Sequence, residues 1–382
     1  MKKFVVTMAL AALLFTACTV PGVVGDQDTV VVGNVDELVA AIERANAEGN
    51  LEILLEDGTY TLDDMLWVEG VNITVRGRSG NRDAVVIEGG GMSGPVSHVF
   101  NVTGDYFSAE NMTVGRVANH GIQIHGDADC DYPRVVNVRF VDTGEQMLKV
   151  SYDPGNTAAS DGGLVENCLF EYTAGVGPQY YIGGVDAHRA YDWIVRGNTF
   201  RSIKSPEVDL AEHAVHFWSD SRGTIVEKNV ITDCDRGIGF GLGESGHSGG
   251  TIRNNFVHTT RDVGIGLENA SGARVYNNTL YTEGYPNSVE YRFGGTSGVS
   301  IINNLANGAI ASRDGGSGTL GANVTDAEAD WFVDPTAGNL HLTSSVPSVV
   351  DRGQTLADVA DDIDGQTRPQ GPAYDIGADE LP

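Results

Sequence analysis

The sequence is poor in cysteine and in basic residues, and each shortage excludes a class of protein. Four cysteines occur in 382 residues, and none has the Cys-x-x-Cys or Cys–His spacing of a zinc site, so no zinc site is expected. Beyond Cys18 the number left is odd and cannot pair fully, and Cys168 and Cys234 stand beside apolar strand positions, which indicates buried thiols. Lys and Arg total 24 against 52 Asp and Glu, a net charge of −28, which argues against nucleic acid or an anionic membrane surface as a partner.

Long apolar runs are also missing except at the N-terminus, so no later segment is expected to span a bilayer. Lys2 and Lys3 precede an apolar run over residues 4–15, and small residues then lead into Cys18. This pattern resembles a bacterial lipoprotein signal. It implies removal of residues 1–17, acylation of Cys18, a tether over 18–30, and an exported protein of the cell envelope or outer surface whose only membrane contact is its lipid anchor. The alternative is an ordinary secretory signal with a chance cysteine.

What the chain has instead is glycine, 50 residues of it, among many short alternating apolar runs, which favours a turn-rich all-β protein. One helix is expected first, over 35–48, because Asn34 and Glu37 form a capping box. Its apolar residues fall on one face: Leu38, Ala41, Ile42 and Ala45. A helix before the first strand suits the open end of a β-solenoid, which it would cap.

An asparagine then recurs at the same place in a repeated unit, at steps of 19 to 31 residues. The members are Asn111, Asn137, Asn167, Asn198, Asn229, Asn255, Asn278, Asn304 and Asn323. Stacked asparagines at one bend can hydrogen-bond each other and the neighbouring backbone, so each turn templates the next. We therefore predict a right-handed parallel β-helix with three short strands per turn over 31–330, closed by an irregular C-terminal cap over 331–382.

A second strand precedes each asparagine, and its alternation places the third and fifth positions outside. The predicted fifth-position column is His125, Lys149, His188, His216 or Phe217, Gly241, Glu268, Arg292 and Ser312, and the third positions contribute Gln123, Asp186 and Glu290. The register of the fourth copy is ambiguous by one residue, and a slip of one would turn His216 inward.

The segments DGTYTL and DIGADE, together with the asparagine ladder, resemble secreted right-handed parallel β-helix proteins of the pectate-lyase superfamily. The resemblance covers residues from about 35 to 380. It implies the fold, with a polysaccharide as partner and no nucleic acid. The superfamily includes lyases, hydrolases, epimerases and non-enzymatic adhesins, so the fold alone leaves the activity open.

Two local patterns point to one patch. EQMLKVSYD followed by LVENCLF is similar to the turn of alginate and chondroitin lyases that presents a catalytic lysine, which implies that role for Lys149. The nearest match to the catalytic arginine of those lyases is Arg189, although 151–163 and 171–182 are longer here. GGVDAHRAYDWIVRGNTF resembles the Asp-Pro-His segment of mannuronan C5-epimerases, with Asp186 and His188 matching and alanine in place of proline.

Uronate lyases and C5-epimerases share a first step, in which the sugar carboxylate is neutralised and a base removes the C5 proton. We expect neighbouring positive charge to lower the pKa of Lys149, which then serves as base or as carboxylate neutraliser. His188 and His216 are the other acid–base candidates, and Asp186 would orient a histidine or bind calcium, the one cofactor candidate. The expected substrate-binding residues are Asp186, Tyr180, Tyr181, Trp218 and His125, with the inserted loops 151–163, 171–182 and 202–212 as walls.

The sequence therefore predicts a monomeric, surface-anchored polysaccharide lyase or C5-epimerase. One alternative is a non-catalytic glycan-binding or structural β-helix. Another is an inverting glycoside hydrolase, for which Asp233 and Asp235 are the close carboxylate pair in this block.

Overall fold

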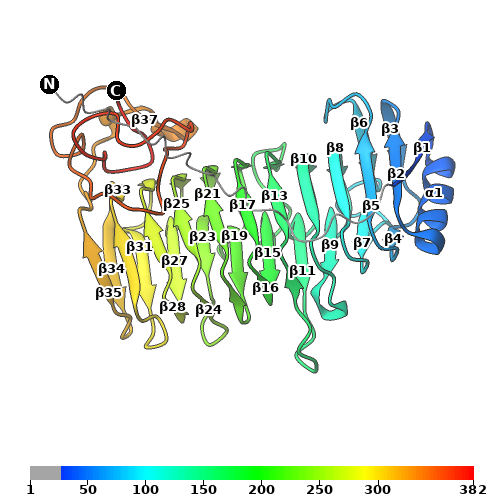
Figure 1. The fold of residues 1–382 in the computed structure, drawn as a ribbon, viewed down its shortest axis with the longest axis horizontal. Coiled ribbons are helices and arrows are strands. Elements are labelled where there is room, and N and C mark those ends of the chain that lie inside the picture. The colour runs from blue at the N-terminus through cyan, green and yellow to red at the C-terminus, as the bar shows by residue number, and fades with distance from the viewer. Residues whose placement is uncertain (1–26) are drawn as a thin grey trace, which may run out of the picture.

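The computed structural model describes residues 27–382, which form one long coil of β-strands with about 11 turns (Figure 1). The predicted signal over 1–17, Cys18 and the tether up to residue 26 lie outside the described residues. Residues 28–30, expected in the tether, instead begin strand β1 (Asp28–Val32), which pairs in parallel with β2 (Leu51–Leu55). No helix in the described part of the chain is long and apolar enough to cross a membrane.

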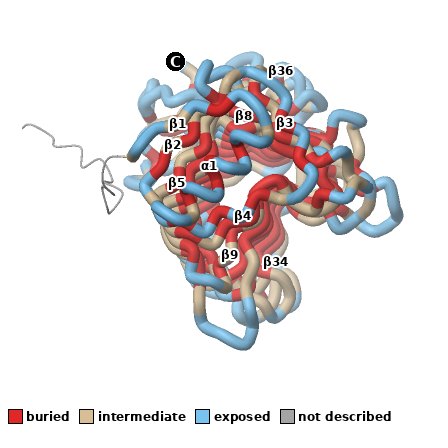
Figure 2. Tube along the Cα trace, turned by 90° about the vertical axis from the view of Figure 1, so that its right-hand side faces the viewer, coloured by how far each residue is buried: buried red, intermediate tan, exposed pale blue. Residues whose placement is uncertain are grey.

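The predicted helix is α1 (Val35–Glu48), which lies at the N-terminal end of the coil (Figure 2). Asn34 Oδ1 accepts the backbone N–H of Glu37 at 3.0 Å, and the Glu37 carboxylate accepts the N–H of Gly33 at 2.8 Å. All four residues expected on its inner face are buried: Leu38, Ala41, Ile42 and Ala45. Packing of this face holds the helix in place, since a short helix gains most of its stability from tertiary contact.

Each turn contributes strands to three parallel ladders. The ladder that precedes the asparagine corner holds β1, β2, β5 (Ile73–Gly77), β8 (Ser108–Gly115), β10 (Arg134–Val141), β13 (Leu164–Glu166), β17 (Ile194–Arg196), β21 (Ile225–Glu227), β25 (Thr251–Arg253), β29 (Arg274–Tyr276), β32 (Val299–Ile302) and β35 (Gly318–Gly321). The ladder that follows the corner holds β3 (Gly58–Thr61), β6 (Val85–Glu88), the second halves of β8 and β10, β14 (Leu169–Glu171), β18 (Thr199–Arg201), β22 (Val230–Cys234), β26 (Phe256–Thr259), β30 (Thr279–Thr282) and β33 (Leu305–Ala306). Because β8 and β10 run through the corner, these two ladders count as one 20-stranded sheet.

The third ladder is a separate ten-stranded sheet, which carries the candidate site. It holds β4 (Leu66–Val68), β7 (Phe100–Val102), β9 (Ile122–His125), β11 (Leu148–Ser151), β15 (Val185–His188), β19 (His213–Trp218), β23 (Arg236–Phe240), β27 (Ile265–Glu268), β31 (Asn287–Arg292) and β34 (Ala309–Arg313). A short five-stranded sheet links it to the next turn, made of β12 (Ser160–Asp161), β16 (Ala190–Tyr191), β20 (Ser221–Arg222), β24 (His247–Ser248) and β28 (Ala270–Ser271), and the short helix η1 (Gly126–Ala128) follows β9.

Inward side chains of successive turns stack into a continuous apolar core. The rings of Phe140, Phe170 and Phe200 lie one above the other, with centroids 4.5 Å and 4.6 Å apart. All three are fully buried, and each contributes roughly 1.5–3 kcal/mol through its apolar area. Seen along the coil, the buried residues line its interior (Figure 2).

The asparagine ladder exists over six consecutive turns: Asn198, Asn229, Asn255, Asn278, Asn304 and Asn323. From Asn229 onward, each Oδ1 accepts both the backbone N–H and the Nδ2–H of the asparagine one turn earlier. Asn255, for example, donates to Asn278 Oδ1 at 3.1 Å and 2.9 Å. Its Nδ2 also donates to the Val226 carbonyl at 2.9 Å, so a fully buried amide is satisfied from both sides.

The first three predicted members belong to a different column. Asn111, Asn137 and Asn167 have φ of 57°, 53° and 55°, the left-handed conformation that lets the chain turn at this corner. The residue in line with Asn198 is Cys168, whose backbone N–H donates to Asn198 Oδ1 at 2.8 Å. The prediction was therefore wrong by one residue in these turns, because asparagine is favoured both in the ladder and at the left-handed position beside it.

The C-terminal segment folds back along the side of the coil, over the later turns (Figure 1). It contains η2 (Ala329–Trp331), β36 (Phe332–Asp334), η3 (Pro335–Ala337) and β37 (Asn339–Leu342). Phe332 and Leu340 pack with Phe256 of β26 and Leu305 of β33. Asn277 Nδ2 donates to the carbonyls of residues 375 and 377, both at 3.1 Å. The extension predicted to close the solenoid thus covers the asparagine corner.

Candidate functional site

The candidate residues lie on the outer face of β11, β15 and β19, but in a register different from the predicted one. Lys149 aligns with Gln123 and Asp186, and Asp186 aligns with His216, so all of these share the third-position column. His125 aligns with Ser151, and His188 with Trp218, in the fifth-position column. The predicted placement of Lys149 and His216 beside His188 in one column was wrong. At the far end Arg292 aligns with Arg313 in place of Ser312.

Lys149 is a nearly buried cation that is already paired. Its side-chain ammonium forms an ion pair with Asp186 Oδ2 and donates a hydrogen bond to His188 Nε2 at 2.9 Å. Burial works to lower the pKa of Lys149, but the Asp186 carboxylate outweighs it and raises that pKa above its ordinary value. The expected lowering of this pKa was therefore wrong, because the neighbour in register is a carboxylate and not a cation.

Asp186 is held as an anion at the centre of the cluster. Burial opposes its charge, yet the Lys149 ammonium beside it holds the pKa of Asp186 well below its usual range. Trp218 Nε1 donates to the second carboxylate oxygen, Oδ1, at 2.8 Å. Both oxygens are thus engaged by side chains of this protein. The carboxylate is not free for a cation, so a calcium ion held by Asp186 does not fit the residues present.

His188 has an assignable tautomer. Lys149 carries only donors, so His188 Nε2 accepts, and Nδ1 therefore bears the proton and donates to Ser219 Oγ at 3.0 Å. The ring lies between Tyr152 and Trp218, with centroid distances of 4.7 Å and 4.4 Å. Burial lowers the pKa of His188 although Asp186 acts to raise it, which leaves the imidazole neutral at pH 7.

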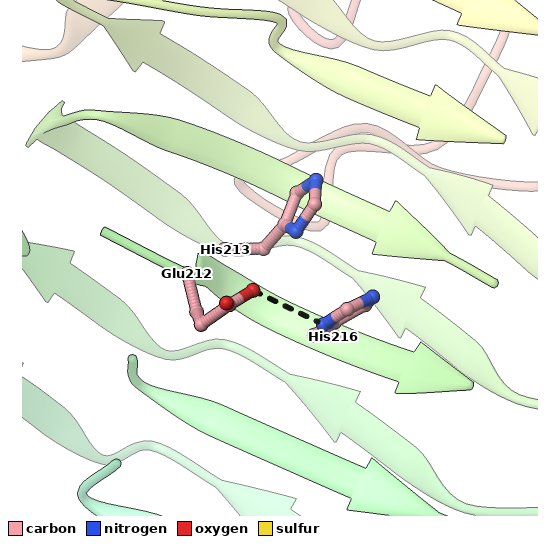
Figure 3. Close-up of side chains that lie close together, drawn as sticks. All are labelled: Glu212, His213 and His216. Carbon is pink, nitrogen blue, oxygen red and sulfur yellow. Dashed lines mark ion pairs between the residues drawn. The ribbon is translucent and has the colours of Figure 1, made fainter. Parts of the chain in front are cut away.

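Beside this cluster lies a group of three further residues, two of which the sequence analysis missed. Glu212, His213 and His216 gather on one side of β19 (Figure 3). His216 Nδ1 is 3.9 Å from Glu212 Oε2 and 3.5 Å from Asp186 Oδ1, and the His213 and His216 ring centroids are 4.6 Å apart. Burial holds the pKa of His213 well below its ordinary value. The sequence signal was Glu-His-x-x-His over 212–216, which mattered only once the strand start was known.

Arg189 does not join the cluster. Its backbone has φ of 44°, and its guanidinium donates to the carbonyls of Asp153, at 3.2 Å, and Asn156. It also lies over the Tyr152 ring, 5.3 Å from the centroid. Arg189 therefore anchors the loop that follows β11, which projects from the coil in Figure 1.

The remaining predicted binding residues surround the cluster. Tyr180 and Tyr181 are 44% and 41% exposed on the loop before β15, and Tyr181 contributes to the raised pKa of Lys149. Trp218 stacks on His216 with a centroid distance of 5.3 Å. His125 lies farther along the same face, where it bonds Asn101 Oδ1 at 2.8 Å and stacks on Trp67.

Two groups among residues 27–382 have the ligand types and spacing for a metal ion: Glu212 with His213 and His216, and His341 with Asp364 and Asp379. Asp362, close to the second group in sequence, holds a turn, since its Oδ1 accepts the backbone N–H groups of Asp364 and Gln366 at 3.0 Å and 2.7 Å.

The fold and the polar outer face define the class of protein. The chain is a right-handed parallel β-helix, and residues 183–329 match the family model described as right handed beta helix region. No curated protein sequence matches the chain significantly.

Solved structures give the same fold. The chain is similar to the pectate lyase Pel9A, at 17% identity and a TM-score of 0.59, over 89% of this chain and 90% of that one. It is also similar to the A-module of the Azotobacter vinelandii mannuronan C-5 epimerase AlgE6, at 13% identity and a TM-score of 0.50, over 78% and 96%. The alginate lyase from Paenibacillus sp. str. FPU-7 matches at 15% identity and a TM-score of 0.46, over 67% and 94%. The resemblance predicted from the sequence is confirmed at the level of the fold.

Proposed function

We propose that this protein is a polysaccharide lyase, or the closely related C5-epimerase, acting on a uronate-containing glycan. The observation that carries the proposal is the contact of Lys149, on β11, with both Asp186 and His188 of the next turn, on β15. The likeness in fold to a pectate lyase and a mannuronan C-5 epimerase supports it. The protein acts as a monomer, tethered to the cell envelope through Cys18.

In the proposed reaction Lys149 neutralises the sugar carboxylate. Its raised pKa keeps the amine protonated, so it is an electrostatic partner for the anion and not the base. When the ammonium turns to the substrate it releases His188 Nε2, whose lone pair then accepts the C5 proton. Asp186 stays ionised and stabilises the imidazolium that forms.

The second half of the reaction separates the two activities. In a lyase the C5–H electrons form the C4–C5 double bond, the C4–O bond breaks, and the leaving oxygen takes a proton. Tyr181, exposed on the loop before β15, supplies that proton in this proposal. In an epimerase C4–O stays intact, and an acid on the other side of the ring gives a proton to the opposite face of C5. Tyr152 and Trp218 flank His188 as stacking surfaces for the sugar.

A non-catalytic glycan-binding or structural role is the second candidate, and one observation favours it. Lys149 and Asp186 are only 9% and 2% exposed and satisfy each other, as a structural ion pair would. The hydrolase alternative gains no such support. Asp235 is fully buried and accepts the backbone N–H groups of Ser205 and Ala211, both at 3.0 Å, while Asp233 pairs with Lys204 at 2.7 Å.

The test is incubation of the protein with alginate, pectate and glycosaminoglycans, followed by ultraviolet absorbance of unsaturated uronate and by proton exchange at C5. We expect turnover of one polymer, and loss of it in His188→Gln and Lys149→Met. Lys204→Met is the matched control, because that lysine also pairs with an aspartate but lies outside the site. Glycan binding without turnover, unchanged in both site variants, would favour the second candidate.

A further inference from the structure

Three buried polar atoms of one small cluster have no hydrogen-bond partner. They are Glu212 Oε2, His213 Nδ1 and His216 Nδ1, and their residues contribute ligand atoms that all lie within 4.8 Å of one another. His213 is 7% exposed and His216 is fully buried. Leaving a buried polar atom unpaired costs about 1–3 kcal/mol, so three together on one site indicate a missing partner and not chance.

The hydrogen bond of His216 shows which of its ring nitrogens is available to a ligand. Its Nε2 lies 3.2 Å from the Gly241 carbonyl oxygen, an acceptor only, so Nε2 must carry the proton. Its other ring nitrogen, Nδ1, faces two carboxylate oxygens, Glu212 Oε2 at 3.9 Å and Asp186 Oδ1 at 3.5 Å, and forms no hydrogen bond with either. A metal ion held at this point would be a partner for both His216 Nδ1 and the unpaired Glu212 oxygen.

The surrounding backbone makes room for this arrangement. A Cβ built on Gly239 would lie 2.9 Å from three atoms of the His213 ring, and one on Gly266 would lie 3.6 Å from His213 Nε2. Glycine at 239 therefore leaves the space that the imidazole occupies, whereas a Cβ at 266 would only touch the ring. His213 also lines a cavity of ≈ 120 Å³ with Gly241 and Glu268, so a ligand or water has access to this side of the cluster.

We propose that Glu212, His213 and His216 bind a divalent first-row transition-metal ion. Two imidazoles and one carboxylate are the donor set of open sites for zinc and similar ions, which keep a position for water or substrate. Calcium prefers six to eight oxygen ligands, so this site selects against it. Asp186 lies beside the site with its Oδ1 turned to His216, and Trp218 Nε1 orients that oxygen.

The charges around the cluster suit a cation. Three carboxylates, Asp186, Glu212 and Asp262, face two side-chain cations, Lys149 and Arg236. Arg236 Nη1 is 4.0 Å from Glu212 Oε2, beyond hydrogen-bond distance, and its Nε is turned to Asp262 at 3.0 Å. The negative charge of Glu212 is therefore not neutralised by a hydrogen-bonded cation of this protein.

The proposal stands apart from the proposed function, since a metal here would hold whether or not a uronate is the substrate. The test uses untagged protein stripped with a chelator and titrated with Zn²⁺ by calorimetry, then with Co²⁺ while its visible ligand-field spectrum is recorded. We expect one Zn²⁺ per chain, a Co²⁺ spectrum typical of a nitrogen- and oxygen-ligated site, and no displacement by excess Ca²⁺.

The variants Glu212→Gln and His213→Gln keep the size of each side chain and should weaken binding about tenfold or more. His341→Gln removes a histidine from the other cluster and should leave the Zn²⁺ affinity unchanged. Circular dichroism shows whether each variant is folded, and the Co²⁺ spectrum of the unaltered protein needs no variant at all. Absence of stoichiometric binding to the unaltered protein, or loss of binding in His341→Gln alone, would overturn the proposal.

Discussion

Lys149 and Asp186 occupy the same register position on the adjacent strands β11 and β15 and form an ion pair with almost no exposure to solvent. Both partners use their remaining hydrogen-bonding capacity on the site, Lys149 toward His188 and Asp186 toward Trp218. The pair therefore couples two neighbouring turns of the coil to the chemistry on their outer face.

Replacing one partner of this pair should cost much more stability than replacing both. Lys149→Met leaves the Asp186 anion buried and unpaired, for which we expect a loss of about 3–5 kcal/mol in unfolding free energy. The double variant with Asp186→Asn removes the stranded charge and should recover most of that loss. Chemical denaturation of both variants gives the comparison.

Lys204→Met is the control for this measurement. Its pair with Asp233 is 26% and 35% exposed, so we expect a loss of about 1 kcal/mol or less. A double variant that is no more stable than Lys149→Met alone would contradict the coupling.

His247 should make the stability of the fold sensitive to acid. Its ring is buried against Phe240, with a centroid distance of 4.0 Å, and burial lowers its pKa to about 3. Below pH 6.5 the unfolded chain takes up a proton on this histidine that the folded chain refuses, so its contribution to stability is complete above pH 6.5 and is lost as pH falls toward 3.

The linkage amounts to about 2 kcal/mol between pH 7.5 and pH 5 for a histidine shifted this far. Thermal melts of the unaltered protein and of His247→Gln across this range give the difference, because the other titrating groups are common to both. Equal pH slopes for the two proteins would show that His247 is not the group concerned.

Cys168 already imitates an asparagine of the ladder. Its Sγ accepts the N–H of Val138 at 3.4 Å and donates to the Val135 carbonyl at 3.4 Å. Burial raises the pKa of this thiol to about 12, so the S–H is present to donate. Asn198 makes the same two bonds one turn later, at 2.8 Å and 3.0 Å.

Cys168→Asn should therefore extend the ladder and raise the unfolding free energy by about 1 kcal/mol, since amide hydrogen bonds replace weaker sulfur ones. The reverse change, Asn198→Cys, should lower it. Denaturation midpoints of the two variants decide the matter, and a larger loss in Cys168→Asn than in Asn198→Cys would refute it.

Arg189 should act on the loop that follows β11 and not on the reacting atoms. Removing its guanidinium in Arg189→Met frees the carbonyls of Asp153 and Asn156. We expect faster backbone hydrogen exchange over 153–157, with protection of β15 unchanged. A loss of turnover as complete as that of His188→Gln, with the loop still protected, would instead support a catalytic role.

The fold was predictable because its signals repeat. The glycine-rich turns and the alternation recur in every turn of the coil. The capping box of α1 occurs once, and no other reading of that segment competes with a helix. The outer columns were not predictable to the same degree. Alternation determines which residues face outward, but a shift of two residues preserves it, and loops of different length between turns hide the shift. Lys149 was displaced by such a shift, from the position of His125 to that of Gln123.

The chemistry of the site followed the register. In the predicted register Lys149 shares a column with His188 and neighbouring positive charge lowers its pKa. In the observed register its direct neighbour is Asp186, whose carboxylate raises that pKa. Glu212 and His213 escaped notice because they stand where the chain enters β19, a boundary that alternation alone does not define.

The third-position column of the ten-stranded sheet forms a continuous row of side chains on the outer face of the coil, perpendicular to the strands. It consists of one residue from each strand: Trp67, Asn101, Gln123, Lys149, Asp186, His216, Gly239, Gly266, Glu290 and Ala311. Neighbouring residues of this column lie about 4.8 Å apart, the distance between paired strands. A linear polymer lying along the coil would meet them in order. Because the inward residues of each turn form the packed core, the outward residues can be substituted one turn at a time while the fold stays the same.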